Sequence, residues 1–239
     1  MQIEKKETLE NDFDISISKT NEQQIDTFEQ LFKIYNNHTN LISKNDEINL
    51  FEKHIYDSLS FLLFKNRYIT SENTKLLDIG TGGGFPSIPI AIACENINIF
   101  PIDSIAKKIG FIELIQKELR LNNLHPICKR VEDLEQKEKS SFDIVTSRAV
   151  APLNTLLEYA IPFLKQNGYF VAYKSKNADE EIQNAQNALS VLKAEIIDRI
   201  EYKLPKLEEY KRELIIIKKI GKTPSLYPRK SGQAKKNPI

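Results

Sequence analysis

Apolar residues recur along the chain at two spacings, which predict alternating helices and strands. Steps of three and four residues predict an amphipathic helix from residue 21, on the positions Ile25, Phe28, Leu31, Phe32 and Tyr35. A second helix of this kind is expected after Asp46. Residues 1–20 are polar and mixed, with no sustained period. We therefore expect a helical N-terminal cap over residues 1–73.

Short apolar runs between polar segments predict strands in the rest of the chain. We expect strands at 76–79, 97–103, 126–131, 142–147, 169–174, 196–204 and 212–220, the last two as a hairpin-like pair. Helices are expected from Pro86 and at 104–121, 152–165 and 178–194, with Asn167-Gly168 marking the end of the third. Pro101 cannot donate to a strand ladder, so a bulge or an early end of pairing is expected there. The alternation predicts an α/β fold with a mostly parallel seven-stranded sheet over residues 74–220.

Composition fits one such domain. The chain has 239 residues, and 41% of them are hydrophobic. No apolar run approaches bilayer-spanning length, and the N-terminus lacks signal-peptide features, so we expect a cytoplasmic protein. Cys94 and Cys128 are isolated, which favours neither a zinc site nor a disulfide framework.

The C-terminal residues differ in charge from the rest. From Lys218 onward there are seven bases and no acid, whereas the whole chain carries a net charge of +1. Residues 221–239 are also rich in proline, glycine and serine, so we expect a basic, flexible tail. The tail bases Arg229, Lys230, Lys235 and Lys236 are candidates for binding nucleic-acid phosphates.

A strand, loop and helix unit at residues 75–93 carries the candidate chemistry. It places Asp78, Gly80, Gly82 and Gly84 in the pattern acid-x-G-x-G-x-G, in which glycine lets the backbone approach a ligand. Phe85 occupies the third glycine position of the dinucleotide pattern G-x-G-x-x-G, which is therefore not met. The unit resembles motif I of class I methyltransferases, which bind S-adenosylmethionine. The alternative is a glycine-rich turn with another nucleotide ligand or none.

Strand ends supply the other candidates, because ligands of open α/β sheets bind at the carboxyl ends of the strands. Asp103 ends the second strand and is expected to accept both ribose hydroxyls; an N-terminal helix acid is the alternative. Glu132, or Asp133, is a candidate for the adenine amino group, with the backbone of Val131 and Glu132 at the ring edge. A charged, solvated loop is the other interpretation of that segment.

Basic residues end the next two strands. Arg148 follows a buried strand and is expected to have a carboxylate or phosphate partner. Lys174 and Lys176 are candidates for lining a nucleic-acid entrance, although solvated surface lysines are the simpler interpretation. No metal-ligand cluster is evident, and the three dispersed histidines are expected to be structural. No residue is assigned as a general base.

Several longer stretches resemble one family. They are NLIS (40–43), HIYDSLS (54–60), LLDIGTGGGFPSIPI (76–90), IDSIAKK (102–108), RVEDL (130–134), FDIVTSRAVAPL (142–153) and the tail YPRKSGQAKKNP. Together they resemble the bacterial small-subunit ribosomal RNA guanine-N7 methyltransferases, also called glucose-inhibited division protein B. Ser87 departs from the glycine common at that position of the family.

The resemblance implies a class I, Rossmann-like enzyme that methylates N7 of a guanine in the 530 loop of 16S ribosomal RNA. It implies cofactor contacts at Gly80, Phe85, Val131, Glu132 and Arg148, with Asp103 in the general class I role. The expected partner is 16S RNA or the small subunit, and the protein is expected to act as a monomer without a metal. The alternatives are a methyltransferase for a small molecule or protein, and a non-catalytic RNA-binding assembly factor.

Overall fold

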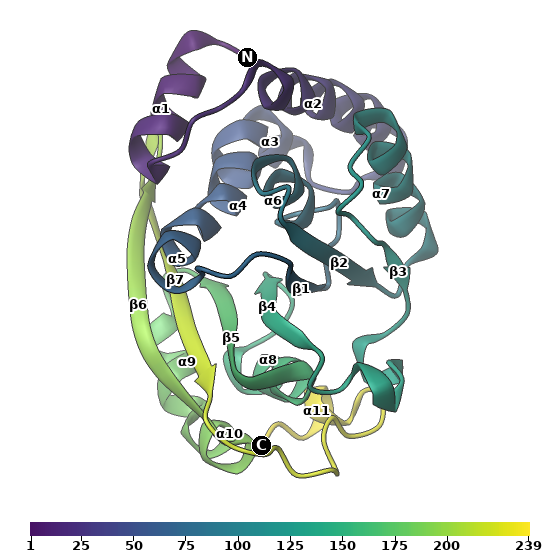
Figure 1. Cartoon of the computed structure of the whole chain (residues 1–239), viewed down its shortest axis with the longest axis vertical. Helices are drawn as coiled ribbons and strands as arrows, with labels where there is room; N and C mark the ends of the chain where they lie inside the picture. Colours follow the sequence, from purple (N-terminus) through teal and green to yellow (C-terminus); the bar gives the residue numbers. More distant parts are fainter.

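Seven strands form one sheet in the order β3-β2-β1-β4-β5-β7-β6 in the computed structural model, which describes residues 1–239 apart from the side chain of Glu208 (Figure 1). The first five strands in that order run parallel, and β7 runs antiparallel to both β5 and β6. The predicted class I architecture is therefore confirmed. The strand bounds are β1 Thr74–Ile79, β2 Ile97–Asp103, β3 Ile127–Cys128, β4 Phe142–Arg148, β5 Leu164–Lys174, β6 Ala194–Leu204 and β7 Leu207–Lys219.

Helices cover both faces of the sheet. One face carries the N-terminal helices with α6 and α7, and the other carries α8 to α11. Alternate residues of β1 serve the two cores, since Leu76 packs in the first and Leu77 in the second. The helix bounds are α1 Ile3–Phe13, α2 Lys19–Thr39, α3 Lys44–Ile48, the π-helical turn η1 Phe51–Tyr56, α4 Asp57–Leu59, α5 Phe61–Tyr68, α6 Ser87–Ala93, α7 Ala106–Leu119, α8 Leu153–Ala160, α9 Ala178–Asn184, α10 Gln186–Leu192 and α11 Gln233–Lys236. Short 3₁₀ turns lie at Val131–Asp133, Gln136–Glu138 and Ile161–Phe163.

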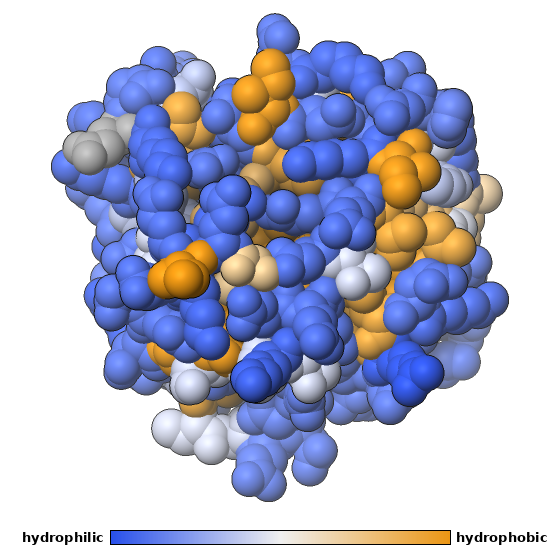
Figure 2. All heavy atoms as spheres, turned by 90° about the horizontal axis from the view of Figure 1, so that it is seen from above, coloured by the Kyte–Doolittle hydropathy of each residue, from blue (hydrophilic) through white to orange (hydrophobic). Residues whose placement is uncertain are grey.

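The surface is mainly polar on the face seen from above, where apolar side chains show in separate groups (Figure 2). Scattered exposed apolar residues are normal for a folded chain. Among the described residues, no helix has the length and apolar character needed to cross a bilayer.

Helix α1 is an element that the sequence pattern did not predict. It buries only Leu9 and Phe13, so too few apolar positions exist to show a helical period. Tertiary contacts hold it: the Tyr56 hydroxyl donates to Asp12 at 2.8 Å, and the rings of Phe13 and Tyr56 lie 4.8 Å apart.

The predicted helix 152–165 was too long. Helix α8 ends at Ala160, and a 3₁₀ turn follows. Pro162 has no N–H to donate to the carbonyl of residue 158, and its ring crowds that carbonyl, so the α-helix cannot continue. Asn167-Gly168 consequently lies within β5. The predicted helix 178–194 is also divided, at Ala185, into α9 and α10.

A bulge or an early end of pairing was predicted at Pro101, and this prediction was wrong for the ladder between β1 and β2. Their parallel pairing continues in register through Asp78–Pro101 to Ile79–Ile102. The N–H of Ile99 donates toward β3, to the carbonyl of Asn123 at 2.8 Å. Because N–H groups two residues apart point the same way, the missing N–H of Pro101 also faces β3. On that side the pairing of the described residues is sparse and consists of an isolated bridge and two further residue pairs.

Candidate active site

The glycine loop joins β1 to α6 and is tied to β2, because the N–H groups of Gly80 and Thr81 both donate to the carbonyl of Ile102. Gly82 has a φ of +59° and faces open space, since a Cβ built there would meet nothing closer than 3.9 Å. Gly84, with a φ of +88°, has no such room, because its Cβ would lie 2.3 Å from Ile88 Cδ1. The loop therefore packs closely at Gly84 and is open at Gly82.

Asp103 lies beside this open position. Its Oδ2 accepts from the Gly82 N–H at 3.2 Å, and its Oδ1 accepts from the Ile105 N–H at 2.9 Å. Lys108 Nζ lies 3.4 Å from Oδ2. A carboxylate has about four acceptor positions, and these three donors leave about one of them for a hydroxyl of a ligand.

Asp78 is placed differently, because its carboxyl group is fully buried. It accepts from the Ser87 hydroxyl at 2.7 Å and from the Thr146 hydroxyl at 3.2 Å. Burial raises the pKa of Asp78 to about 6, although the hydroxyl hydrogen bonds act in the opposite direction. Its side chain thus connects the start of α6 to β4 within the protein, and Ser87, the departure from the family pattern, is one of its partners.

The segment after β3 is a 3₁₀ turn where the sequence predicted a longer strand. Val131 is buried there, and the Glu132 carboxylate accepts from the N–H of Gly232 at 3.1 Å. The strand pairing of Asp103 with Cys128 puts this turn on the same edge of the sheet as the glycine loop. The C-terminal residues therefore reach a predicted cofactor residue.

Arg148, at the end of β4, has the carboxylate partner that the sequence predicted. Its Nη1 donates to Asp57 Oδ2 at 2.8 Å and to the Lys53 carbonyl at 2.9 Å, and its Nη2 donates to His54 Nδ1 at 2.7 Å. The Phe85 ring lies 5.3 Å from the guanidinium and 5.0 Å from the His54 ring. Arg148 thereby joins the glycine loop to the N-terminal helices.

The Lys53 carbonyl that accepts from Arg148 lies in the π-helical turn η1, and the Asp57 N–H at the end of this turn donates to the His54 carbonyl. The turn thus brings Lys53, His54 and Asp57 to one guanidinium. Asp57 is itself buried and also accepts from the Tyr202 hydroxyl at 2.7 Å. Asp57 is a site residue that the sequence pattern did not predict. It lies within the HIYDSLS stretch, but nothing local signals a partner 91 residues away.

The loop after β4 covers part of the glycine loop. A Cβ built on Gly80 would lie 2.5 Å from Val150 Cγ2, so these two residues are in direct contact. Lys174 holds this loop by donating to the Ala151 carbonyl at 3.2 Å and to Glu181 at 2.5 Å. Lys174 is only 8% exposed, so it is neither a solvated surface lysine nor an unpaired cation.

The residues predicted to bind RNA fall into two groups. Arg148 and Lys174 line one cavity of about 630 Å³ at the carboxyl ends of β4 and β5, together with Lys53, Tyr210 and Arg212. The tail bases lie on the C-terminal residues, which pack against α8 in place of extending as an arm. Within the tail, Arg229 pairs with the buried Glu158 at 2.6 Å, whereas Lys230, Lys235 and Lys236 are exposed.

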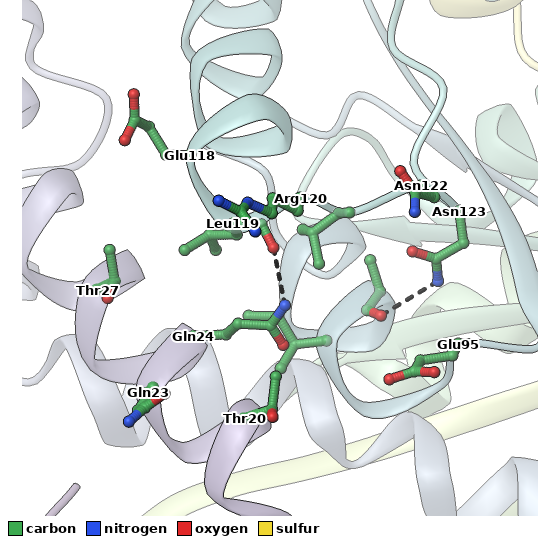
Figure 3. Close-up of a pocket in the computed structure, with 13 residues that line it drawn as sticks. Thr20, Gln23, Gln24, Thr27, Glu95, Glu118, Leu119, Arg120, Asn122 and Asn123 are labelled. Carbon is green, nitrogen blue, oxygen red and sulfur yellow. Dashed lines mark hydrogen bonds between the residues drawn. The ribbon is translucent and has the colours of Figure 1, made fainter.

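A second cavity, of about 490 Å³, lies at the amino ends of the strands, between α2 and the turns after α6 and α7 (Figure 3). Two of its amide side chains bond to the protein: Gln24 donates to the Leu119 carbonyl at 2.8 Å, and Asn123 to the Ala91 carbonyl at 3.1 Å. These bonds hold neighbouring elements together. The predicted site residues do not line this cavity, so we place the active site at the carboxyl ends.

Comparison with known proteins matches residues 21–215 to the family described as GidB, rRNA small subunit methyltransferase G. Ribosomal RNA small subunit methyltransferase G of Streptococcus pyogenes serotype M12 (strain MGAS2096) is 40% identical over 234 residues, which cover 97% of either chain. The same protein of serotype M5 (strain Manfredo) has the same identity and coverage. The chain belongs to this family.

Solved structures agree on the fold. An S-adenosylmethionine-dependent O-methyltransferase from Thermotoga maritima aligns with a TM-score of 0.53 at 16% identity, covering 71% of this chain and 66% of that one. TYW2 of M. jannaschii, solved in complex with AdoMet, aligns with a TM-score of 0.52 at 20% identity, covering 66% and 74%. The predicted family, fold, methyltransferase activity and cofactor are confirmed.

The residues fit S-adenosylmethionine on their own chemistry. The open side of Gly82 leaves room for a ligand next to a carboxylate that can accept a further hydroxyl donor. The same residues suit an adenosyl group, whose ribose carries hydroxyl donors.

Proposed function

We propose that this chain transfers a methyl group from S-adenosylmethionine to N7 of a guanine in 16S ribosomal RNA, in the 530 loop. Gly80, Gly82, Gly84, Phe85, Asp103, Val131, Glu132 and Arg148 would hold the cofactor, with Asp78 supporting the loop from within. The relatives named above are ribosomal RNA methyltransferases, which supports the RNA substrate. We further propose that the chain acts in the cytoplasm, where ribosomal subunits are assembled, and that it acts as a monomer.

The cavity beside Arg148 supports N7 as the acceptor, because the acid and base groups that line it are already engaged. Asp57 pairs with Arg148, Glu181 with Lys174, and Asp46 with Lys53 at 3.1 Å. His54 Nδ1 accepts from Arg148, and burial, followed by the Arg148 charge, lowers the pKa of His54 to about 3. None of these groups is a ready acceptor for a proton.

Guanine N7 needs no such acceptor. It has an unprotonated lone pair at neutral pH, so a bond to the methyl carbon forms without loss of a proton. The bond between that carbon and the cofactor sulfur breaks, and its electron pair leaves with the sulfur. An exocyclic amine or a hydroxyl would have to lose a proton in the same transfer. The chain's contribution is to align the base and exclude water.

The test is to map N7-methylguanine chemically in 16S RNA, both as naked RNA and in small subunits, after incubation with the protein and S-adenosylmethionine. We expect the mapping chemistry to cleave the RNA strand at one guanine of the 530 loop. No cleavage is expected there when the cofactor is omitted. Methyl groups found at an exocyclic amine, or on a small molecule or protein only, would contradict the proposal. Failure to bind the cofactor at all would favour the non-catalytic assembly factor.

The pH dependence of the methylation rate gives a second test. Single-turnover methylation with saturating RNA and cofactor should vary little between about pH 6.5 and 8.5, because no essential base titrates there. A bell-shaped profile that one substitution abolishes, with both affinities intact, would identify a general base and contradict the N7 mechanism.

A further inference from the structure

The C-terminal residues 228–237, here called the strap, are anchored by a buried ion pair. Glu158 on α8 is 1% exposed and receives three donors from one residue: the Arg229 backbone N–H at 2.8 Å, Nε at 2.9 Å and Nη2 at 2.6 Å. Arg229 Nη2 also donates to the Asn237 carbonyl at 2.8 Å. Nε and Nη2 of this guanidinium are thus engaged within the protein, although the sequence predicted that Arg229 binds RNA phosphates.

The middle of the strap is held as well. Ala234 is 1% exposed and packs in the core cluster that α8 helps to form. The Ser231 hydroxyl accepts from Arg130 Nη1 at 3.1 Å. These contacts place the Gly232 N–H 3.1 Å from Glu132 Oε1. Three separate contacts therefore fix the strap over the turn that follows β3.

Tyr159 shows how closely α8 and this turn pack. Burial, followed by the Glu132 charge, raises the pKa of the Tyr159 phenol to about 12, and a hydrogen bond to Glu132 acts in the same direction. Two adjacent residues of α8 therefore support the contact between the strap and Glu132. Glu158 anchors the strap, and Tyr159 lies near the Glu132 carboxylate.

We propose that the strap is part of the cofactor site, in which Arg229 and Gly232 act as positioning residues by holding the Glu132 carboxylate ready for the adenosyl group. The inference rests on the proposed cofactor role of Glu132. The strap N–H takes one acceptor position of the carboxylate and restricts the side-chain rotamer, and a carboxylate has about four such positions, so capacity remains to accept from the ligand. Without the strap, the Glu132 side chain would lose this restraint. Cofactor binding would then have to order the side chain, which would weaken the affinity.

A double-mutant cycle tests the proposal. S-adenosylmethionine affinity is measured by calorimetry for the full chain, for a chain lacking residues 226–239, for Glu132→Ala, and for the two changes combined. We expect the deletion alone to weaken binding about threefold to tenfold, the usual range for one hydrogen bond. In the Glu132→Ala background the deletion should have little further effect, because the strap acts through that carboxylate.

Two further variants protect the test from a folding failure. Removing both members of the buried pair, with Arg229→Ala and Glu158→Ala together, releases the strap without leaving an unpaired buried charge. It should weaken the cofactor in the same way as the deletion, and circular dichroism should show a folded protein. Lys222→Ala removes an exposed base at the start of the tail and should leave the affinity unchanged.

The outcomes separate the two proposals. If the full chain binds the cofactor and the strap variants bind it equally well, the strap inference is wrong while the proposed function stands. Additive losses in the cycle would mean that the strap supports the fold and not Glu132, which also overturns the inference. If the full chain does not bind S-adenosylmethionine, the proposed function itself fails.

Discussion

Replacing Asp78 with asparagine tests whether this carboxyl group is held within the protein at an energetic cost. The group is fully buried and its pKa is raised from 3.8 to about 6, with burial as the main cause. In the unfolded chain the carboxyl loses its proton at lower pH than in the folded protein. Between the two pKa values the folded state therefore binds more protons, and its stability falls as the pH rises.

The full difference corresponds to roughly 3 kcal/mol, because one pKa unit is worth about 1.4 kcal/mol. The contribution is present below the unfolded value of 3.8 and is lost once the pH passes about 6. About 2 kcal/mol of the change falls between roughly pH 4.5 and 7.5, where the measurement is practical. Asparagine does not titrate, and its amide can still bond to the Ser87 and Thr146 hydroxyls.

The assay is urea denaturation followed by circular dichroism, since the chain has no tryptophan. The free energy of unfolding of Asp78→Asn minus that of the wild type should rise with pH by about 2 kcal/mol over this window and then level off. Taking the difference at each pH cancels the other titrating groups. A difference that is flat, or that falls with pH, would refute the argument that burial dominates this pKa.

Three further predictions concern the groups around the glycine loop. Asp103→Ala should weaken S-adenosylmethionine about tenfold or more in calorimetry, because a charged hydrogen-bond acceptor for the ribose is removed; an unchanged Kd would remove Asp103 from the cofactor site. Asp57→Ala should destabilise the protein by about 3 to 5 kcal/mol in urea, because Arg148 is left largely buried without its carboxylate partner. As a control, Asp198→Ala breaks a partly exposed ion pair and should lower the stability by about 1 kcal/mol or less. Equal stability losses for the two variants would contradict the stabilising role of the buried pair between Asp57 and Arg148. The ring signals of His54 in nuclear magnetic resonance spectra should not titrate between about pH 5 and 8, because its pKa lies near 3, and a titration in that range would show that the histidine is available as a base.

RNA binding by the exposed tail lysines remains a prediction. Replacing Lys230, Lys235 and Lys236 with alanine should reduce the salt dependence of 16S RNA binding, by up to about one unit of slope for each lysine that pairs with a phosphate. An unchanged slope would show that they do not bind phosphate. The division of the chain into residues 1–73, 74–220 and 221–239 also remains a prediction.

The sequence by itself determined the class of fold and the position of the candidate site. The strand and helix periods, the glycine spacing after Asp78 and the strand-end residues Asp103 and Arg148 are local signals, and each depends on neighbours only a few residues away. They were sufficient to predict a mostly parallel seven-stranded sheet with its ligand site at the carboxyl ends of the strands. Failures came where local pattern was weak or overridden, as in α1 and at Pro162.

Only the tertiary structure decided what each charged group does. Arg148 finds Asp57 at 91 residues' separation, and Arg229 finds Glu158 at 71. In the sequence, Arg229 cannot be distinguished from the exposed Lys230 beside it, since composition counts both as bases in a polar tail. Folding buries Glu158 on α8, and a buried carboxylate must be paired. That requirement draws Arg229 inward, brings Gly232 to Glu132 and leaves the lysines at the surface.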